Sequence, residues 1–370
     1  MNVRLPRRQA LLVINSKSGP NRDSLLRIHE LVDVLKEFRI RADVHVKLRK
    51  KQARDETHAA ATSGKYDLVI AAGVDGTVEA VARGLLGTRV LLSIIPLGTF
   101  NNVATSLRIP KDVRKACRLI ATGAPHPVDI GLARTADHKK ERPFLEISAV
   151  GLGAIAGKIG QDIQKGRWAP ALADVPTAVE MGTVPMRVRL DAGEAMSVRS
   201  LLVTVSVSPR AGAGLRLAPR ARMDDGLFDI SIFEGSDAPA VLADVASTAF
   251  GPLPLSGPAN VRQLRAAELD IWTADPLPVS IGAKLIGHTP ASFRIEHGAL
   301  SVISHPPAIS SAEDGSAARA LLTGLAVLGS QVAPRVGISK HVPLVPVLGA
   351  LALGWISQPL AAQVLRRVRR

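Results

Sequence analysis

Residues 69–85, "VIAAGVDGTVEAVARGL", pass from an apolar run through a Gly-Val-Asp-Gly turn into small residues at helical spacing. The pattern predicts a buried strand at 67–72 and a helix at 77–86. Glycines at such a turn let the backbone approach a ligand, and the first N–H groups of the helix then point at that ligand with the positive end of the helix dipole. Taken alone, this turn is weak evidence for a ligand, and a tight structural connection is the default interpretation.

The same arrangement recurs through the first third of the chain. Further strands are predicted at 10–15, 42–48 and 90–95, and further helices at 25–38 and 51–63. Alternating helices and continuously apolar strands indicate a parallel sheet covered on both faces. Strand 10–15 ends in "NSKSG" and strand 90–95 leads into "LGTFNNVA". Because the carboxyl ends of parallel strands meet at one edge, these loops and the opening turn predict a ligand-binding crevice.

The pattern of predicted elements changes from about residue 140. Short strand candidates, separated by Gly and Pro turns, occur at 186–190, 201–206, 228–233, 268–272 and 293–296. This spacing is typical of an antiparallel β-sandwich. We therefore expect an α/β lobe at 1–137, a β-sandwich lobe at 138–306, a small polar linker at 307–319 and a C-terminal tail at 320–370.

The chain is strongly basic, with 47 Lys and Arg against 32 Asp and Glu. Such a charge attracts anionic membrane surfaces, phosphorylated ligands or nucleic acid. No basic stretch is interleaved with aromatic residues, which make up 3% of the chain, so we expect no nucleic-acid partner. Cys117 is the single cysteine, which excludes an intramolecular disulfide and fits a cytoplasmic setting.

The tail differs from the rest of the chain. Residues 341–365 contain no Lys, Arg, Asp or Glu, and arginines follow in "RRVRR". The length suits a membrane span, although three prolines interrupt it. Residues 321–333 form a second apolar run, so a membrane hairpin, an interfacial anchor and a helix packed on the protein all remain open. We expect a cytoplasmic protein associated with the inner membrane through this tail.

A glycine pattern in the middle of the chain offers another reading. "GLGAIAG", residues 151–157, matches the dinucleotide pattern G-x-G-x-x-[GA], and Asp174 follows at the expected interval. However, Asp174 lies in a helix-like segment rather than at the end of a second strand. We therefore expect these glycines to serve close packing or a lipid entrance rather than nicotinamide binding.

Several segments resemble one family. "NSKSG", "GVDGT" and "PLGTFNNVA" are similar to the N-P-x-S-G, G-G-D-G-T and P-x-G-T-x-N-D motifs of the diacylglycerol kinase catalytic domain. "APRARMDDGLFDISIF" and "TPASFRIEHGALSVISHP" look like the family's second-lobe and closing segments, so the resemblance covers residues 8–306. The family includes bacterial lipid kinases and sphingosine kinases, and shares its nucleotide-binding lobe with NAD kinases.

The resemblance implies ATP and Mg²⁺ as cofactors and a lipid hydroxyl as the acceptor, with diacylglycerol the default and a sphingoid base next. It implies Asp75 as the catalytic residue, able to hold magnesium or a water. The implied nucleotide-binding residues are Asn15, Lys17, Ser18, Gly19, Gly73, Gly76, Thr77, Gly98, Thr99 and Asn101. Asp225 and the carbonyl of Leu227 correspond to a magnesium site, although a tight turn into a strand explains the same residues.

The sequence also departs from the family pattern. Val74 replaces the second glycine of G-G-D-G-T, and Asn102 replaces the aspartate of P-x-G-T-x-N-D. The family's D-G-E motif, a candidate source of the catalytic acid, aligns with Gly-Ala-Lys at 282–284. Nearby His288 could act as a base, but a lone histidine in a turn is more often a solvated residue.

These losses support an alternative reading: a catalytically impaired relative that binds nucleotide or lipid as a sensor or scaffold. An NAD kinase-like enzyme is disfavoured by the tail and by the sandwich-like second half. The sequence leaves the oligomeric state open, a homodimer included.

Overall fold

The computed structural model describes residues 8–15, 24–47, 50–155, 182–212, 214, 216–234, 241 and 260–306. This part of the chain divides into two compact units. The first contains the described residues up to Ile130, the segment Arg222–Gly226 and the described residues from Glu296 onward. The second contains the described residues of Gly131–Ala221 and Leu227–Ile295. Two long strands, β5 (Pro125–Thr135) and β16 (Ala291–Ile303), contribute residues to both units.

The first unit alternates strands and helices as predicted. Its other elements are β1 (Arg8–Asn15), α1 (Ser24–Glu37), β2 (Ile40–Lys47), α2 (Lys50–Thr62), β3 (Leu68–Gly73), α3 (Asp75–Leu85), β4 (Leu91–Pro96), α4 (Asn102–Ser106) and α5 (Val113–Thr122). Helix α3 begins two residues earlier than the pattern predicted, directly at the turn.

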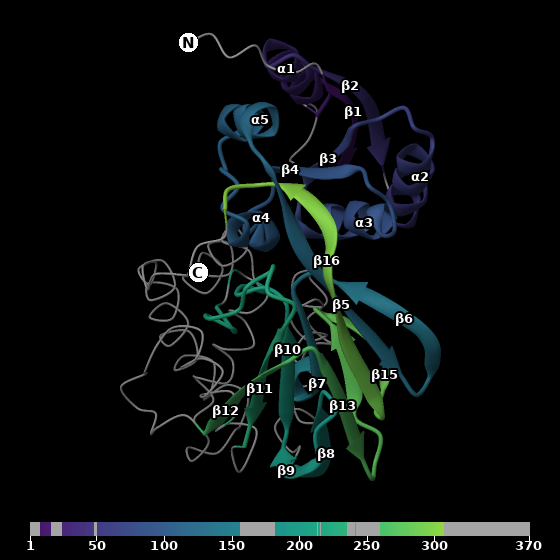
Figure 1. The fold of residues 1–370 in the computed structure, drawn as a ribbon, viewed down its shortest axis with the longest axis vertical. Coiled ribbons are helices and arrows are strands. Elements are labelled where there is room, and N and C mark those ends of the chain that lie inside the picture. Colours follow the sequence, from purple (N-terminus) through teal and green to yellow (C-terminus); the bar gives the residue numbers. More distant parts are fainter. Residues whose placement is uncertain are drawn as a thin grey trace, which may run out of the picture. The chain divides into compact units, whose positions relative to one another are not determined.

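Strands β2, β1, β3 and β4 lie in that order in a parallel sheet, and the end of β16 joins it where Val302 pairs with Leu92. Helices α1 and α5 cover one face, and α2 and α3 cover the other (Figure 1). All six residues of β3 are buried, because both faces of the strand are covered. The predicted parallel sheet with two covered faces is confirmed.

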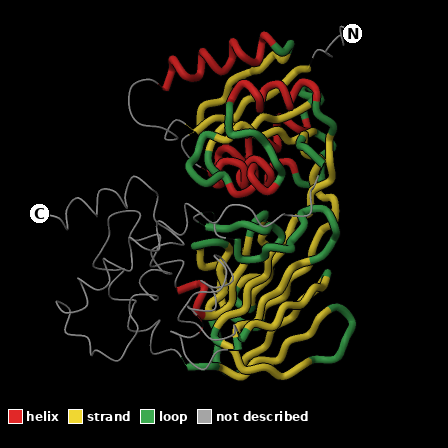
Figure 2. Tube along the Cα trace, turned by 90° about the vertical axis from the view of Figure 1, so that its left-hand side faces the viewer, coloured by secondary structure: helices red, strands yellow, loops and turns green. Residues whose placement is uncertain are grey.

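The second unit consists of antiparallel strands, which appear as neighbouring yellow segments in Figure 2. Besides parts of β5 and β16 it contains β6 (His138–Phe144), β7 (Ile147–Gly151), β8 (Val184–Leu190), β9 (Met196–Ser200), β10 (Leu202–Ser206), β11 (Phe228–Phe233), β12 (Val261–Ala266), β13 (Glu268–Thr273), β14 (Pro278–Ile281) and β15 (Lys284–His288).

These strands form two layers around one apolar core. One layer has the order β12-β11-β10-β7-β14-β15, and the other contains β16, β13, β8 and β9. On β8, Met186 and Val188 point into the core while the alternate arginines are exposed. Val203 and Val205 of β10 enter the same core from the other layer. The predicted antiparallel sandwich is therefore confirmed.

The glycine pattern at 151–157 begins at the end of β7. Gly151 has φ +82°, and a Cβ there would lie 2.2 Å from the Leu201 carbonyl oxygen. The neighbours of β7 are antiparallel, whereas a dinucleotide fingerprint requires a parallel strand–helix–strand unit. This glycine serves close backbone packing, and Asp174 lies outside the described residues.

The predicted linker and tail also lie outside the described residues. Within the part of the chain that the structure describes, no helix is both long and apolar enough to cross a membrane.

Candidate functional site

The three loops singled out from the sequence follow neighbouring strands. Ile14 of β1 pairs with Ala72 of β3, which pairs in turn with Ile95 of β4. The carboxyl ends of β1, β3 and β4 therefore lie side by side, as predicted. Asn15 is the last residue of β1, while Lys17, Ser18 and Gly19 lie outside the described residues.

The loop after β3 is compact and holds a buried hydroxyl. Gly73 lies so close to Thr77 that a Cβ at Gly73 would be 2.6 Å from the Thr77 Oγ1. This oxygen is buried and has no hydrogen-bond partner among the described residues. The N-cap of α3, Val74, provides no side-chain hydrogen bond to the helix. The start of α3 thus combines an unpartnered hydroxyl with an N-terminus that its N-cap side chain leaves uncapped.

The loop after β4 is held in shape by Asn101. This residue adopts the left-handed conformation at φ 50°, and its side chain bonds Gly98 twice. The Gly98 N–H donates to Asn101 Oδ1 at 2.9 Å, and Asn101 Nδ2 donates to the Gly98 carbonyl at 2.6 Å. Thr99 lies between them and is exposed. The Asn101 side chain therefore shapes the loop.

Direct contacts join the two loops. The Leu97 N–H donates to the Gly73 carbonyl at 3.0 Å, and the Val103 N–H donates to Asp75 Oδ1 at 3.2 Å. Gly98 packs against Val74, since a Cβ at Gly98 would lie 2.8 Å from Val74 Cγ1. Val74 itself is 39% exposed, although it occupies the position where the family pattern has a glycine.

Asp75 begins α3 and also bonds the start of α4. Burial raises the pKa of the Asp75 carboxyl, and hydrogen bonds from the backbone N–H groups of Asn102 and Val103 oppose that rise. A raised pKa makes this carboxylate a better proton acceptor than an exposed aspartate. Its bonds to α4 give the same side chain a structural task.

The "RMDDG" segment, residues 222–226, belongs to the first unit, where it forms hydrogen bonds with Asp129 of β5. The Asp129 N–H donates to the Met223 carbonyl at 2.7 Å, and the Gly226 N–H donates to Asp129 Oδ2 at 2.8 Å. Gly226 takes φ +71° at the end of this turn. Asp224 is engaged by Arg222, whose Nε and Nη2 each lie 3.1 Å from a carboxylate oxygen. This turn leads into β11, as the structural reading of these residues anticipated.

The magnesium role of Asp225 and Leu227 stays a prediction. Asp225 is half-buried in the first unit, and Leu227 begins the next segment of the second unit. Within the described residues, no three or more His, Cys, Asp or Glu side chains are grouped so that they could hold a metal ion together.

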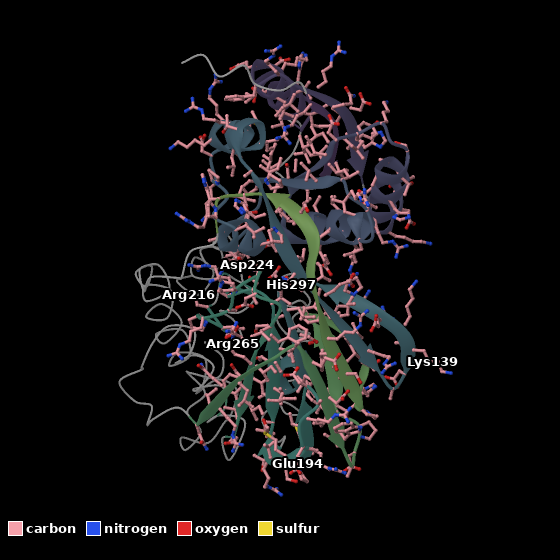
Figure 3. The ribbon with its side chains drawn as sticks, in the orientation of Figure 1. Lys139, Glu194, Arg216, Asp224, Arg265 and His297 are labelled. Carbon is pink, nitrogen blue, oxygen red and sulfur yellow. The ribbon has the colours of Figure 1, made fainter. Side chains whose placement is uncertain are left out.

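Sequence reasoning missed Asp129 and His297, two residues that hold this segment. Asp129 is fully buried, and its Oδ1 accepts hydrogen bonds from His297 Nδ1 and from the Gly298 N–H, each at 2.8 Å. Figure 3 labels His297 on β16 and Asp224 on the turn. The available signal was an aspartate inside the otherwise apolar strand "VDIGL".

The residues that replace the family's D-G-E motif lie at the turn between β14 and β15. Gly282 has φ +53°, and Lys284 is exposed. His288 is not a lone solvated residue, because its Nδ1 lies 2.8 Å from Asp137 Oδ2. This contact with His288 lowers the pKa of Asp137.

Comparison with known proteins agrees with this architecture. Residues 9–133 match the diacylglycerol kinase catalytic domain, and residues 149–304 match the YegS C-terminal NAD kinase beta sandwich-like domain. A probable lipid kinase YegS-like protein of Klebsiella pneumoniae is 29% identical over 296 residues, covering 77% of this chain and 94% of the relative. A diacylglycerol kinase of Bacillus subtilis is 33% identical over 199 residues, covering 49% of this chain and 60% of the relative.

Solved structures show the same fold. A putative diacylglycerol kinase from Bacillus anthracis superposes with a TM-score of 0.65 at 22% identity, covering 83% of this chain and 98% of that structure. The two domains in this order define a two-lobed kinase fold, and the chain belongs to the diacylglycerol kinase and YegS lipid kinase family.

Proposed function

We propose that this protein is an ATP-dependent lipid kinase that phosphorylates the hydroxyl of diacylglycerol or a similar lipid. The observation that supports it best is the juxtaposition of the β3 and β4 loops at one edge of a parallel sheet. Gly73 packs against the Thr77 side chain and Gly98 against the Val74 side chain, so a larger residue at either glycine would push the loops apart. Ligands of open α/β sheets bind at this edge, and phosphate groups favour the N-termini of helices.

The described residues fit a nucleotide at this edge. The buried Thr77 hydroxyl can donate to a phosphate oxygen, and its lack of a partner is costly until a ligand binds. Thr99 is exposed on the adjacent loop. In this proposal Gly76, Asn15, Lys17, Ser18 and Gly19 complete the site, Lys17 as its cation, while Asn101 acts by shaping the β4 loop.

When bound, Mg-ATP supplies the phosphoryl group and the positive charge that neutralises its oxygens. In the transfer, the lipid oxygen bonds to the γ-phosphorus, the bond to the β,γ-bridging oxygen breaks, and the hydroxyl proton must be accepted. Asp75 is the proposed acceptor, because its pKa is raised and it begins the helix at the site. The proposed magnesium ligands are Asp225 and the carbonyl of Leu227, in the stretch that resembles the family's second-lobe segment.

A second candidate is a nucleotide- or lipid-binding sensor or scaffold with little activity. The observation that favours it is the Gly-Ala-Lys turn at 282–284, which carries no carboxylate where the family has two. General-base catalysis is worth roughly a hundred- to ten-thousand-fold, so such a loss is large enough to matter. The exposed Val74 beside Gly98 adds a side chain where phosphate would approach.

One experiment separates the two candidates. The purified full chain is incubated with Mg-ATP and neutral mixed micelles containing diacylglycerol, and labelled phosphatidic acid is measured together with nucleotide binding. A kinase yields product in the wild type and at least about a hundredfold less in Asp75→Asn, which keeps the side chain's shape. Asp112→Asn is the matched control, because Asp112 caps α5 through the Lys115 N–H at 2.8 Å in the same unit.

The product yield and the nucleotide binding together distinguish the two candidates. Wild type and Asp75→Asn both at background, with nucleotide still bound, would reject the kinase and support the sensor. Absence of nucleotide binding in a folded wild type would reject the kinase and the nucleotide-binding sensor, and would leave only a lipid-binding one. For localisation, we propose a cytoplasmic protein at an anionic inner membrane, where such a lipid acceptor would lie.

A further inference from the structure

Two hairpins of the second unit meet side by side. The turn between β5 and β6 contacts β15, where the Ala136 N–H donates to the His288 carbonyl at 3.2 Å and Asp137 pairs with His288. Gly287 permits this approach, because a Cβ there would lie 2.3 Å from Thr135 Oγ1. Figure 1 shows β15 beside the hairpin of β6. The two hairpins therefore present one surface, which we call the hairpin surface.

Exposed cations are concentrated on the hairpin surface. They are Arg134, His138, Lys139 and Lys140 on the first hairpin and Lys284 on the second. Figure 3 shows Lys139 projecting from β6 at the edge of the molecule. Within the described residues, none of the three lysines forms an ion pair.

The acidic groups of the two hairpins are already engaged. Asp137 pairs with His288, and Glu141 pairs with Arg294 at 2.7 Å. The contact with Arg294 lowers the pKa of Glu141, to which the charge of Arg134 also contributes. Both carboxylates thus remain ionised but compensated, and the lysines give the surface its net positive charge.

The second hairpin also carries an exposed apolar side chain. Leu285 follows Lys284 and is 53% exposed, more than Val46 or Val74, the other exposed large apolar residues of the described chain. An exposed leucine next to Lys284, on a surface that also carries Lys139 and Lys140, suits a bilayer, where the ammonium groups meet lipid phosphates and the leucine enters the interfacial region. The absence of aromatic residues on these two turns makes a nucleic-acid strand a poorer occupant.

We propose that the hairpin surface docks the protein onto anionic lipid bilayers, independently of the C-terminal tail. The inference rests on the proposed function in one respect: a kinase with a lipid acceptor has to reach that acceptor at a membrane. Docking itself requires neither ATP nor turnover, so a vesicle assay can fail or succeed separately from the kinase assay.

The test is flotation of the full chain with vesicles of phosphatidylcholine containing a quarter phosphatidylglycerol, against pure phosphatidylcholine. The measured quantity is the partition ratio, which is binding to the anionic vesicles divided by binding to the neutral ones. We expect this ratio to fall by about a hundredfold or more in K139E/K140E/K284E, since each lysine near such a surface contributes about fivefold. Raising the salt concentration should erase the wild-type ratio. Leu285→Ser should weaken binding by a few-fold at both salt concentrations, because it removes apolar burial.

K111E/K115E/R118E is the matched control, since these exposed cations of the first unit give the same change in net charge. It should keep most of the wild-type ratio. The proposal is overturned by an unchanged ratio in K139E/K140E/K284E, or by an equal loss in both triple variants, which would indicate the overall charge alone. It is also overturned by a wild type that binds both vesicles equally, or by a triple variant that loses binding to duplex nucleic acid but not to vesicles.

Discussion

Asp129 Oδ1 accepts a hydrogen bond from His297 Nδ1 at 2.8 Å, across 168 residues of sequence. The aspartate is fully buried, whereas the histidine side chain is 60% exposed. The other two hydrogen bonds of the carboxylate come from the backbone N–H groups of Gly226 and Gly298. One side chain therefore ties β5, the turn at Arg222–Gly226 and β16 together. Asp225, the predicted magnesium ligand, depends on that tie for its position.

Replacing Asp129 with alanine should loosen this turn. Loss of the carboxylate leaves two backbone donors and a histidine without their acceptor, which costs about 3 kcal/mol or more in a buried setting. We expect amide hydrogen exchange at Gly226 and Gly298 to accelerate by about a hundredfold, with a lower thermal midpoint. Asp112→Ala removes a helix cap in the same unit at a cost of about 1 kcal/mol and should leave both amides protected. Unchanged exchange at Gly226 in Asp129→Ala would contradict this account.

Val74 should limit how closely a nucleotide approaches the β3 loop. Its side chain is 39% exposed and packs on Gly98, so shortening it clears the space beside that glycine. We expect ATP to bind about fivefold more tightly to Val74→Gly, an intermediate effect in Val74→Ala, and weaker binding in Val74→Leu. Isothermal titration calorimetry measures the series. An order that does not follow side-chain size would show that Val74 lies away from the bound nucleotide.

The sheet of the first unit was predictable because its signals are local. Each buried parallel strand is a continuous apolar run, as in "LVIAAG", and each helix repeats apolar residues at its own period. The alternation of strands and helices indicates a parallel sheet, in which the loops after β3 and β4 lie at the same edge. In the second unit, alternating strands such as β8 were equally clear, because one face is buried and the other bears arginines.

What the sequence could not provide is long-range pairing. Nothing near residue 129 indicates that its carboxylate will meet His297, because the contact depends on how β5 and β16 are placed. The same holds for Asp137 and His288, which lie 151 residues apart. The structural role of a side chain is also difficult to predict from sequence. The family resemblance predicts Asn101 as a nucleotide ligand, but no sequence signal indicates that both ends of its amide bond Gly98.

Asp75 should make stability depend on pH in an unusual direction. Its folded pKa is raised above the ordinary value of 3.8, so the folded protein holds the proton more tightly than the unfolded chain. The stabilisation from protonation is complete below pH 3.8 and is lost as the pH rises through the raised folded value. Asp75→Asn should remove this decline, measured as the thermal midpoint between about pH 3.5 and 7.

Asp137→Asn serves as the contrasting variant for that experiment. The pKa of Asp137 is lowered by its contact with His288, so its stabilisation is present at higher pH and is lost as the pH falls through the lowered value. The two variants should therefore change the pH profile with opposite signs. Equal profiles for Asp75→Asn and the wild type would show that Asp75 is not buried as described.

The turn at 282–284 should accept the family's acids and gain activity from them. A Cβ at Gly282 would meet no atom within 4 Å, and aspartate is among the residues that tolerate φ +53° best. If the missing carboxylates limit phosphoryl transfer, G282D/K284E should raise phosphatidic acid formation in neutral micelles about a hundredfold. G282N/K284Q is the matched control, since it has nearly the same shape without the acids and should stay at the wild-type rate. An equal rate in both double variants would place the limit elsewhere, with Val74 in the β3 loop as the next residue to change.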